Sequence, residues 1–489
     1  MAEEKESGGF DPVGDVAQVL ADLSTGKGGT HSGHSGHATY FQEFIDLMGE
    51  FGVSRGGLLL VFLVILTSVA SYMLPSFLKI SASWLLALSP LGLPAALITG
   101  MWKAWVWYVR AYNISKQKTV VLEMKFPANV VKSPRAMEAA LAGFWDINGE
   151  TTFIDRYWDG GIRTWYSFEI AGFEGEVHFY IWCWEKFRSR TETFIYAQYP
   201  EIELIEVEDY ATKFHFDPQV TDLFANQMLL EKDPNPLGVA NDIPGRAPPI
   251  MGIYPIRSYL DFEMDRDPKE EYKTDPLALI VERMSNLKKS EQAWTQIIFR
   301  AHIGKIGGTT FQAAAQAVVE ELRFESATFR KHLTEEEQRT ARARGTWKQT
   351  EQIQAIERHA GKRLFEVGIR IAYIAKYEDY SPPNRNSMRW LWQGYNSWYL
   401  NRLRPKRWHG DFDYPWQDFH GVRWILTIRR FLDAYRRRSY FHAPWISPGM
   451  IMCAECIASL FHPPTTAIKS PGLQRIPFTK APPPSNLPK

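Results

Sequence analysis

Residues 56–78 read GGLLLVFLVILTSVASYMLPSFL and contain no charged side chain. After Lys79, a second uncharged run extends over residues 80–102. The hydrocarbon core of a bilayer is about 30 Å thick, and a helix needs about 20 apolar residues to cross it. Each run is long enough, whereas a soluble fold would need a very large core to bury a helix that is apolar all round. We therefore predict a two-helix membrane anchor over residues 55–112.

The two runs differ in their helix breakers. The second contains Pro90 and Pro94, and a proline inside a helix removes a backbone donor and clashes with the preceding turn. We expect the membrane-spanning part to begin at Pro94, a favoured first helical position, and to continue to about Tyr108. Residues 81–92 are then expected to form a short connection at the opposite interface.

Aromatic and basic residues follow the second run. The predicted membrane-interface residues are Trp102, Lys103, Trp105, Trp107 and Arg110. Amphipathic rings and snorkelling cations of this kind mark a membrane–water boundary. Only Lys79 lies between the runs and more basic residues flank them, so the positive-inside rule places both termini in the cytoplasm.

The rest of the chain has the composition of a folded protein. It has 489 residues, a net charge of +1 and 14% aromatic residues, so no global field attracts polyanions and disorder is disfavoured. Three cysteines cannot form a disulfide framework, which agrees with a cytoplasmic location. Before the anchor we expect a disordered polar lead over residues 1–37 and an amphipathic interfacial helix over residues 38–54.

Residues 118–211 carry the clearest pattern of the soluble part. Alternating apolar residues in TVVLEMKF (119–126) predict a strand, and Ser133-Pro134 starts a helix. Two aromatic-rich segments around Gly172 and Gly175 predict a hairpin, and a helix and an acidic edge strand follow. The order βαββαβ is that of the ferredoxin-like arrangement.

The remaining chain is less regular, and we predict an α+β protein overall. Within a second α/β module over residues 212–380, strands are expected at 221–230, 253–262, 293–301 and 364–375. A basic-aromatic helical region is expected over residues 384–462, and an extended Pro-rich tail over residues 463–489. The last packed element is expected near Phe461.

The basic-aromatic region contains the candidate binding residues. They are Arg429, Arg430, Arg436, Arg437 and Arg438, which we expect to form one electropositive surface, with Leu432 and Tyr435 pointing inward. Such a surface could bind DNA phosphates, anionic lipids or an acidic partner. Alternatively, it is a solvated helical face whose aromatic residues belong to a core.

Other motifs have a structural explanation that we favour. Cys453 and Cys456, near His462, have CxxC spacing, but zinc needs four ligands and no second pair occurs, so we expect buried cysteines. Alternate carboxylates in the segment 201–209 are expected to form a solvated strand face. The histidines of residues 31–37 lie in a Gly/Ser linker that fixes no geometry. Because no P-loop motif or catalytic set is recognisable, we expect no cofactor, no metal and no enzymatic activity.

Several phrases together resemble a known family. They are KSPRAMEAALAGF, WDGGIRTWYSFEI, EGEVHFYIW, IYAQYPEIELIEVEDY and the closing LFHPPTTAIKSPGL and KAPPPSNLP. They are similar to bacterial membrane proteins of unknown function that accompany type IV secretion and conjugation-type ATPases. In coupling-type ATPases a tail of this kind precedes the P-loop domain, whereas this chain stops at Lys489. The resemblance therefore implies a separately encoded motor of the FtsK/HerA type.

Together these inferences predict a non-enzymatic component of a translocation machine. It would be a multi-pass protein of the bacterial cytoplasmic membrane, with its soluble part in the cytoplasm. It would act within an oligomeric assembly as a platform for the P-loop ATPase. The alternative is a membrane-tethered nucleic-acid-binding protein without a motor partner.

Overall fold

The computed structural model describes residues 64–69, 75–127, 132–150, 152–232, 252–265, 274–304, 309–330, 346–406, 418–465, 468 and 470–476. The chain divides into two compact units, Met1–Leu85 and Leu86–Lys489. The predicted polar lead, interfacial helix and most of the first apolar run lie outside the described residues. So does the far end of the predicted tail, after residue 476.

Helix α4 extends from Pro75 to Lys116 and contains both Pro90 and Pro94. We predicted a short connection at residues 81–92 before a helix starting at Pro94, which is wrong, because these residues belong to α4. Each proline removes one hydrogen bond from a helix of 42 residues, and the remaining bonds keep the backbone helical on either side. Within the described residues, no helix combines the length and apolar character required to cross a membrane.

The first half of the α/β part has the predicted order of elements. These are β1 (Thr119–Pro127), α5 (Pro134–Phe144), β2 (Trp165–Phe173), β3 (Glu176–Trp184), α7 (Arg188–Gln198) and β4 (Glu203–Val207). A short helix, α6 (Phe153–Tyr157), lies between α5 and β2. The strands pair antiparallel in the order β4-β1-β3-β2.

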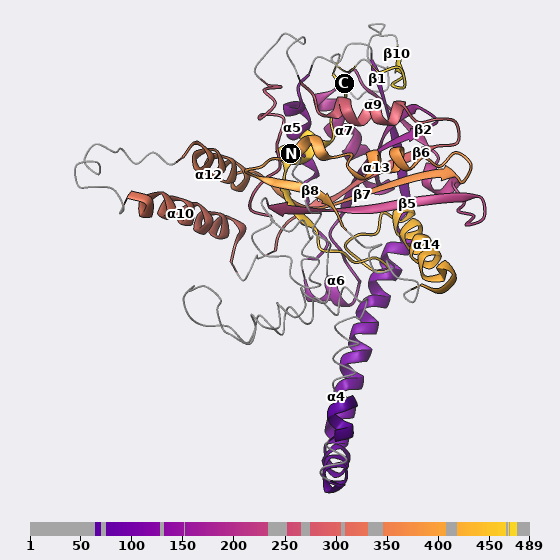
Figure 1. The fold of residues 1–489 in the computed structure, drawn as a ribbon, viewed down its shortest axis with the longest axis vertical. Coiled ribbons are helices and arrows are strands. Elements are labelled where there is room, and N and C mark those ends of the chain that lie inside the picture. Colours follow the sequence, from indigo (N-terminus) through magenta and orange to yellow (C-terminus); the bar gives the residue numbers. More distant parts are fainter. Residues whose placement is uncertain are drawn as a thin grey trace, which may run out of the picture. The chain divides into compact units, whose positions relative to one another are not determined.

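The second half repeats this strand order. Its elements are β5 (Thr221–Lys232), α9 (Leu277–Ser285), β6 (Gln292–Ala301), α10 (Phe311–Arg330), α12 (Trp347–Ala360), β7 (Leu364–Lys376), α13 (Pro382–Arg389) and β8 (Asn401–Pro405). The antiparallel order is β6-β7-β5-β8, so in each half the third strand lies between the second and the first. Strands β2 and β6 pair, which joins both halves into one mixed α/β structure around a single sheet (Figure 1).

Two sequence-based assignments in the second half are wrong. Residues 253–262 form turns and irregular backbone rather than a strand, because Pro255 lacks a donor. The side chains of Tyr254 and Ile256 enter the core from this loop. The region 384–462 is only partly helical. Besides α13, α14 (Val422–Arg436) and α15 (Ala454–Leu460), it contributes β8 and β9 (Met450–Cys453) to the sheet.

The chain also stays packed beyond Phe461, contrary to expectation. Ile468 and Leu473 are buried in the main core, and β10 (Arg475–Ile476) pairs in parallel with the end of β1. The carbonyl of Gly472 accepts a hydrogen bond of 2.9 Å from the backbone of Val177. Apolar residues at wide spacing among prolines carry no periodic signal, which is why the sequence did not predict this packing.

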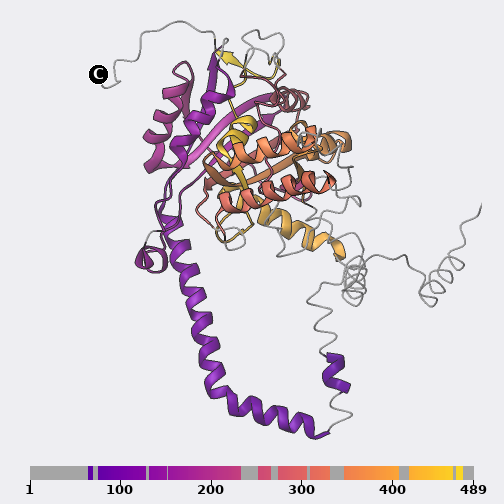
Figure 2. The same cartoon turned by 90° about the vertical axis from the view of Figure 1, so that its left-hand side faces the viewer.

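The two faces of the sheet bury different cores. Phe168 and Ile170 on β2 face the larger core, which α5, α7, α9 and α15 cover. Trp165 on β2 faces the smaller core, which includes residues of α14 and of α8 (Tyr210–Lys213). Figures 1 and 2 show the last turns of α4 joining the α/β part beside α6. The candidate site lies on this smaller-core side.

Candidate functional site

The last turns of α4 are fixed to the α/β part by specific contacts. Val109 is buried, Trp105 Nε1 donates to the carbonyl of Tyr157 at 3.0 Å, and Asn113 Nδ2 donates to the carbonyl of Asp159 at 3.0 Å. The predicted interface residues lie on these turns. Trp102, Lys103, Trp105 and Trp107 are exposed, and Arg110 is half-buried.

Helix α6 packs closely on α4. The Thr152 side chain caps the helix, accepting from the Asp155 backbone, and the Asp155 carboxylate accepts from the Thr152 backbone. Gly160 has φ +65°, and a Cβ there would lie 2.4 Å from the carbonyl oxygen of Val109. A glycine is therefore required where this loop crosses α4.

Aromatic rings extend the contact between the two helices. The ring centroids of Trp102 and Tyr157 are 5.5 Å apart, those of Trp102 and Phe153 are 6.3 Å apart, and those of Trp105 and Trp158 are 5.6 Å apart. Such ring pairs add to the stability gained by burial. A helix of five residues is too short to be stable alone, so these contacts with α4 hold α6 in place.

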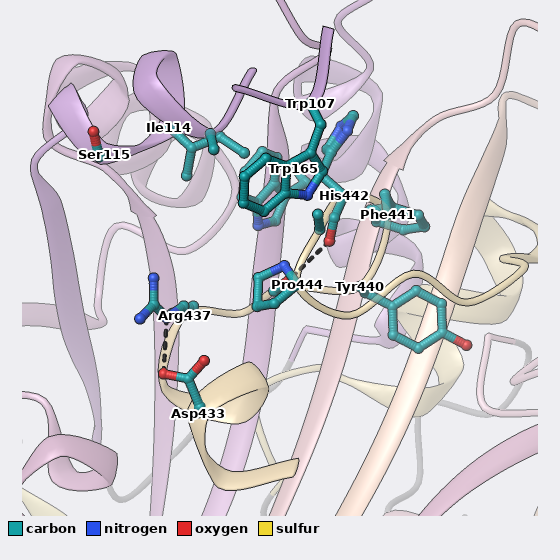
Figure 3. A pocket seen from close by; sticks show the side chains of 13 residues that line it. Trp107, Ile114, Ser115, Trp165, Asp433, Arg437, Tyr440, Phe441, His442 and Pro444 are labelled. Carbon is teal, nitrogen blue, oxygen red and sulfur yellow. Dashed lines mark hydrogen bonds and ion pairs between the residues drawn. The ribbon is translucent and has the colours of Figure 1, made fainter. Parts of the chain in front are cut away.

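A pocket of about 260 Å³ lies between α4 and the end of α14. Trp107 and Ile114 of α4 form one wall, Trp165 lies beside them, and the loop after α14 closes the other side (Figure 3). The ion pair of Arg437 with Asp433, at 2.8 Å, lines the same pocket. The pocket is therefore mainly apolar, with several aromatic rings and one exposed charge pair.

His442 lines the pocket as a neutral side chain. Burial, together with the charge of Arg300, lowers its pKa to about 3. Its Nε2 lies 3.3 Å from Arg300 Nη1. Since a guanidinium only donates, Nε2 of His442 accepts this hydrogen bond and the neutral ring carries its proton on Nδ1.

A charged network lies behind His442. Glu366 pairs with Arg300 at 2.6 Å and with Arg163 at 3.2 Å. Burial raises the pKa of Glu366, but the hydrogen bond with His302 and the charges of both arginines outweigh it and lower the pKa to about 2. Glu366 is therefore ionised at neutral pH and compensates the two guanidinium groups.

The hydroxyl groups near the pocket are used in structural hydrogen bonds. Ser439 Oγ donates to the backbone carbonyl of His442 at 2.8 Å. Tyr440 Oη donates to the carbonyl of Pro448 at 3.3 Å and accepts from Gln227 at 2.7 Å. Neither hydroxyl is oriented by a neighbouring imidazole, as a nucleophile for acyl transfer would be.

The prediction that five arginines form one surface is wrong for Arg438. Its side chain is completely buried, and its Nε and Nη2 donate to the two carboxylate oxygens of Glu169, each at 2.9 Å. It also pairs with Asp209. Arg438 has φ +49° in the turn that follows α14. Buried charges need such partners, and one sequence does not reveal them.

Glu169 collects donors from several elements. Burial raises its pKa, but the charge and hydrogen bonds of Arg438 outweigh this and hold the pKa below the ordinary value. Three further donors surround the carboxylate, namely Ser167 at 2.7 Å, Tyr210 at 2.7 Å and Gln296 at 2.9 Å. The network therefore connects β2, β6, α8 and the end of α14.

The other four arginines differ in exposure. Arg436 is half-buried and donates to the carbonyls of Ala211 and Phe214 at 3.0 Å and 2.5 Å, so it closes the α8 turn. Arg429, Arg430 and Arg437 are exposed. Leu432 and Tyr435 point inward, as predicted. The candidate binding surface is thereby reduced to exposed arginines on one side of α14.

Helix α14 and the turn before it expose apolar residues that were not among the predicted site residues. Phe419 in the turn is 69% exposed, and Val422 and Leu426 in the helix are 55% and 52% exposed. Their spacing of three and four residues places Val422 and Leu426 on one helical face. The signal was present in the sequence, but an apolar stripe is more often buried than exposed.

The cysteines are buried, as predicted, whereas the acidic segment 201–209 is only partly a solvated face. Cys453 and Cys456 have their sulfur atoms 3.6 Å apart. Glu203 and Glu206 of β4 are exposed, but Asp209 pairs with the buried Arg438, so the prediction is wrong for Asp209. In the part of the chain that the structure describes, no cluster of three or more histidine, cysteine or acidic residues could hold a metal.

Comparison with family models gives one match. The model of a domain of unknown function, DUF8128, matches residues 161–475, which is more than half of the chain. The chain belongs to the DUF8128 family. No curated protein matches it. The DUF8128 region includes the sheet from β2 onward, α14 and the Glu169–Arg438 network, whereas α4 and α6 precede it.

Proposed function

We propose that this DUF8128 protein is a non-enzymatic, membrane-associated component of a bacterial translocation machine of the type IV secretion or conjugation kind. It serves as a cytoplasmic platform for a separately encoded P-loop ATPase of the FtsK/HerA type, within an oligomeric assembly. One observation supports the proposal most. Helix α4 exposes a run of large apolar side chains, and its last turns are fixed to the α/β part.

The exposed run includes Leu93, Leu97, Ile98 and Met101, which are 58–73% exposed. Leaving apolar surface in water costs about 25 cal/mol per Å², so a helix with this surface is stabilised by an apolar environment. The run leads directly into the aromatic and basic residues Trp102 to Arg110. This order supports association with a membrane through residues 55–112, with the α/β part held at the boundary.

The α/β part supports a scaffold role. The strand orders β4-β1-β3-β2 and β8-β5-β7-β6 are equivalent. This order supports the ferredoxin-like assignment for both halves. The hydroxyl groups near the pocket are already engaged in structural bonds, which supports binding rather than catalysis.

The alternative, a membrane-tethered nucleic-acid-binding protein, depends on α14. Arg429 and Arg430 are exposed and could contact phosphates, but Arg438 is buried and Arg436 is engaged. DNA binding depends on neutralising several phosphates. The exposed Leu426 beside these arginines favours a protein partner, because phosphates offer no apolar contact.

The experiment is co-purification. A tagged full-length chain, solubilised from native membranes in mild detergent, should retain a P-loop ATPase identified by mass spectrometry. The double substitution Val422→Glu with Leu426→Glu should remove the ATPase if α14 is the docking helix. Trp398→Glu, at a residue that is 76% exposed and distant in sequence, is the matched control. If no P-loop ATPase is recovered and salt-sensitive DNA binding is found, the alternative replaces the platform.

A further inference from the structure

Helix α6 and the residue after it carry large apolar side chains that the described chain leaves mostly exposed. Phe153 is 64% exposed, Ile154 63% and Trp158 61%. Phe153 and Ile154 lie on this short helix, and Trp158 directly follows it. Single exposed apolar residues are ordinary, but a compact group of three on one projection marks an interaction site.

The projection has a fixed structure. The capping box of Thr152 and Asp155 closes its start, and Gly160 packs against the backbone of α4 at its end. Trp105 and Asn113 of α4 donate hydrogen bonds to backbone carbonyls of this segment. The exposed side chains are thus presented by a supported element.

The position of α6 beside α4 indicates what kind of surface its exposed side chains contact. Phe153 stacks on Trp102, the residue at which the uncharged run of α4 ends. The ring of Trp158 contacts that of Trp105, about one helical turn further along, at an interplanar angle of 57°. The exposed apolar residues of α6 therefore lie level with the end of the exposed apolar run of α4 and are continuous with it.

The charges around α6 fit a lipid surface. Arg156 has 48% of its side chain exposed, lies 4.0 Å from Glu150 and stacks over the ring of Tyr157. Lys103, which follows Trp102 in α4, is also exposed. The Asp155 carboxylate is used in the helix cap. Aromatic rings flanked by cations are typical of residues in the headgroup layer of a bilayer.

We propose that α6 is a second membrane-contact element, which inserts Phe153, Ile154 and Trp158 into the headgroup layer beside α4. This inference rests on the membrane association proposed above. Two separate contacts fix a rigid body relative to a plane better than one helix alone. Helix α6 therefore sets the orientation of the sheet with respect to the membrane.

The test uses the full-length chain with one added cysteine, labelled with an environment-sensitive fluorophore. Cys183, Cys453 and Cys456 are buried, so the label reacts at the added site. Three variants are compared, Ile154→Cys in α6, Leu97→Cys in α4 and Trp347→Cys at the start of α12. Trp347 is 69% exposed, which matches the exposure of the α6 residues. Each protein is reconstituted in phosphatidylcholine–phosphatidylglycerol vesicles with or without lipids that carry a nitroxide near the headgroup.

The proposal predicts that the labels at positions 154 and 97 shift to shorter wavelength and lose most of their emission to the nitroxide. The label at position 347 should keep its emission. Quenching at position 97 without quenching at 154 overturns the role of α6 and leaves the proposed association intact. Quenching at neither position overturns the membrane association and α6 with it. Equal quenching at 154 and 347 means non-specific adsorption and also overturns the role of α6.

Discussion

Replacing Arg438 with Gln should strongly destabilise the protein, although this residue belongs to a stretch of basic residues that looked solvent-exposed. The substitution removes the bidentate contact to Glu169 and the contact to Asp209, and it leaves the Glu169 charge buried at 0% exposure. Breaking a buried ion pair on one side costs about 3–5 kcal/mol. Three hydrogen bonds to Glu169 remain in the variant, so we expect the lower end, about 3 kcal/mol.

The measurement is urea unfolding in detergent, followed by tryptophan fluorescence. Arg437→Gln is the matched control, because its pair with Asp433 is exposed and such pairs contribute about 0–1 kcal/mol. The double variant Glu169→Gln with Arg438→Gln should recover part of the loss, because the charge is no longer left unpaired. A cost below about 1 kcal/mol for Arg438→Gln, similar to the control, would refute the buried network.

Three further outcomes are expected. The folded pKa of His442 is about 3, below the ordinary value of about 6.5, so the unfolded state binds a proton that the folded state does not. His442 should therefore lower the free energy of unfolding by about 1.4 kcal/mol per pH unit as the pH drops from about 6.5 towards 3. Burial lowers the pKa of His359 to about 3 as well, so His442→Phe should reduce the dependence of the urea midpoint on pH between pH 7 and 5 without removing it. Gly160→Ala should detach α6 from α4 and raise its proteolytic cleavage, because φ is +65° and the added Cβ meets a carbonyl, whereas Gly100→Ala, with open space around it, should behave as wild type. Replacing Cys453 and Cys456 with Ala should lower the unfolding midpoint by packing loss alone and leave the zinc content measured by mass spectrometry unchanged; stoichiometric zinc lost in that variant would contradict the packing role.

Local patterns predicted most of the sheet strands but few of the long-range contacts. Alternation located β1, and apolar or aromatic runs located β2, β3, β5, β6 and β7 within a few residues, because these strands are long and bury at least one face. The pattern could not show that β2 pairs with β6, since strand pairing between distant segments leaves no mark on a single sequence. The two modules therefore looked separate, whereas they share one sheet.

The candidate site was less predictable, for physical reasons. Arginine at the end of a helix is usually solvated, and its burial depends on carboxylates that lie far away in the chain. The exposed residues of α6 were not selected either, because a five-residue helix is too short to show periodicity. The exposed residues of α6 can be recognised as a candidate contact site only from their position beside Trp102 and Trp105, which the fold brings close to α6.

Flotation shows whether the chain associates with a membrane through α4. Membranes from cells that express the full-length chain are washed at alkaline pH, which removes proteins held by charge alone, and are then floated on a density gradient. We expect the chain to rise with the lipid, because the exposed side chains of Leu93, Leu97, Ile98 and Met101 then lie in an apolar environment. Recovery of the intact chain in the soluble fraction at the bottom of the gradient would contradict this expectation.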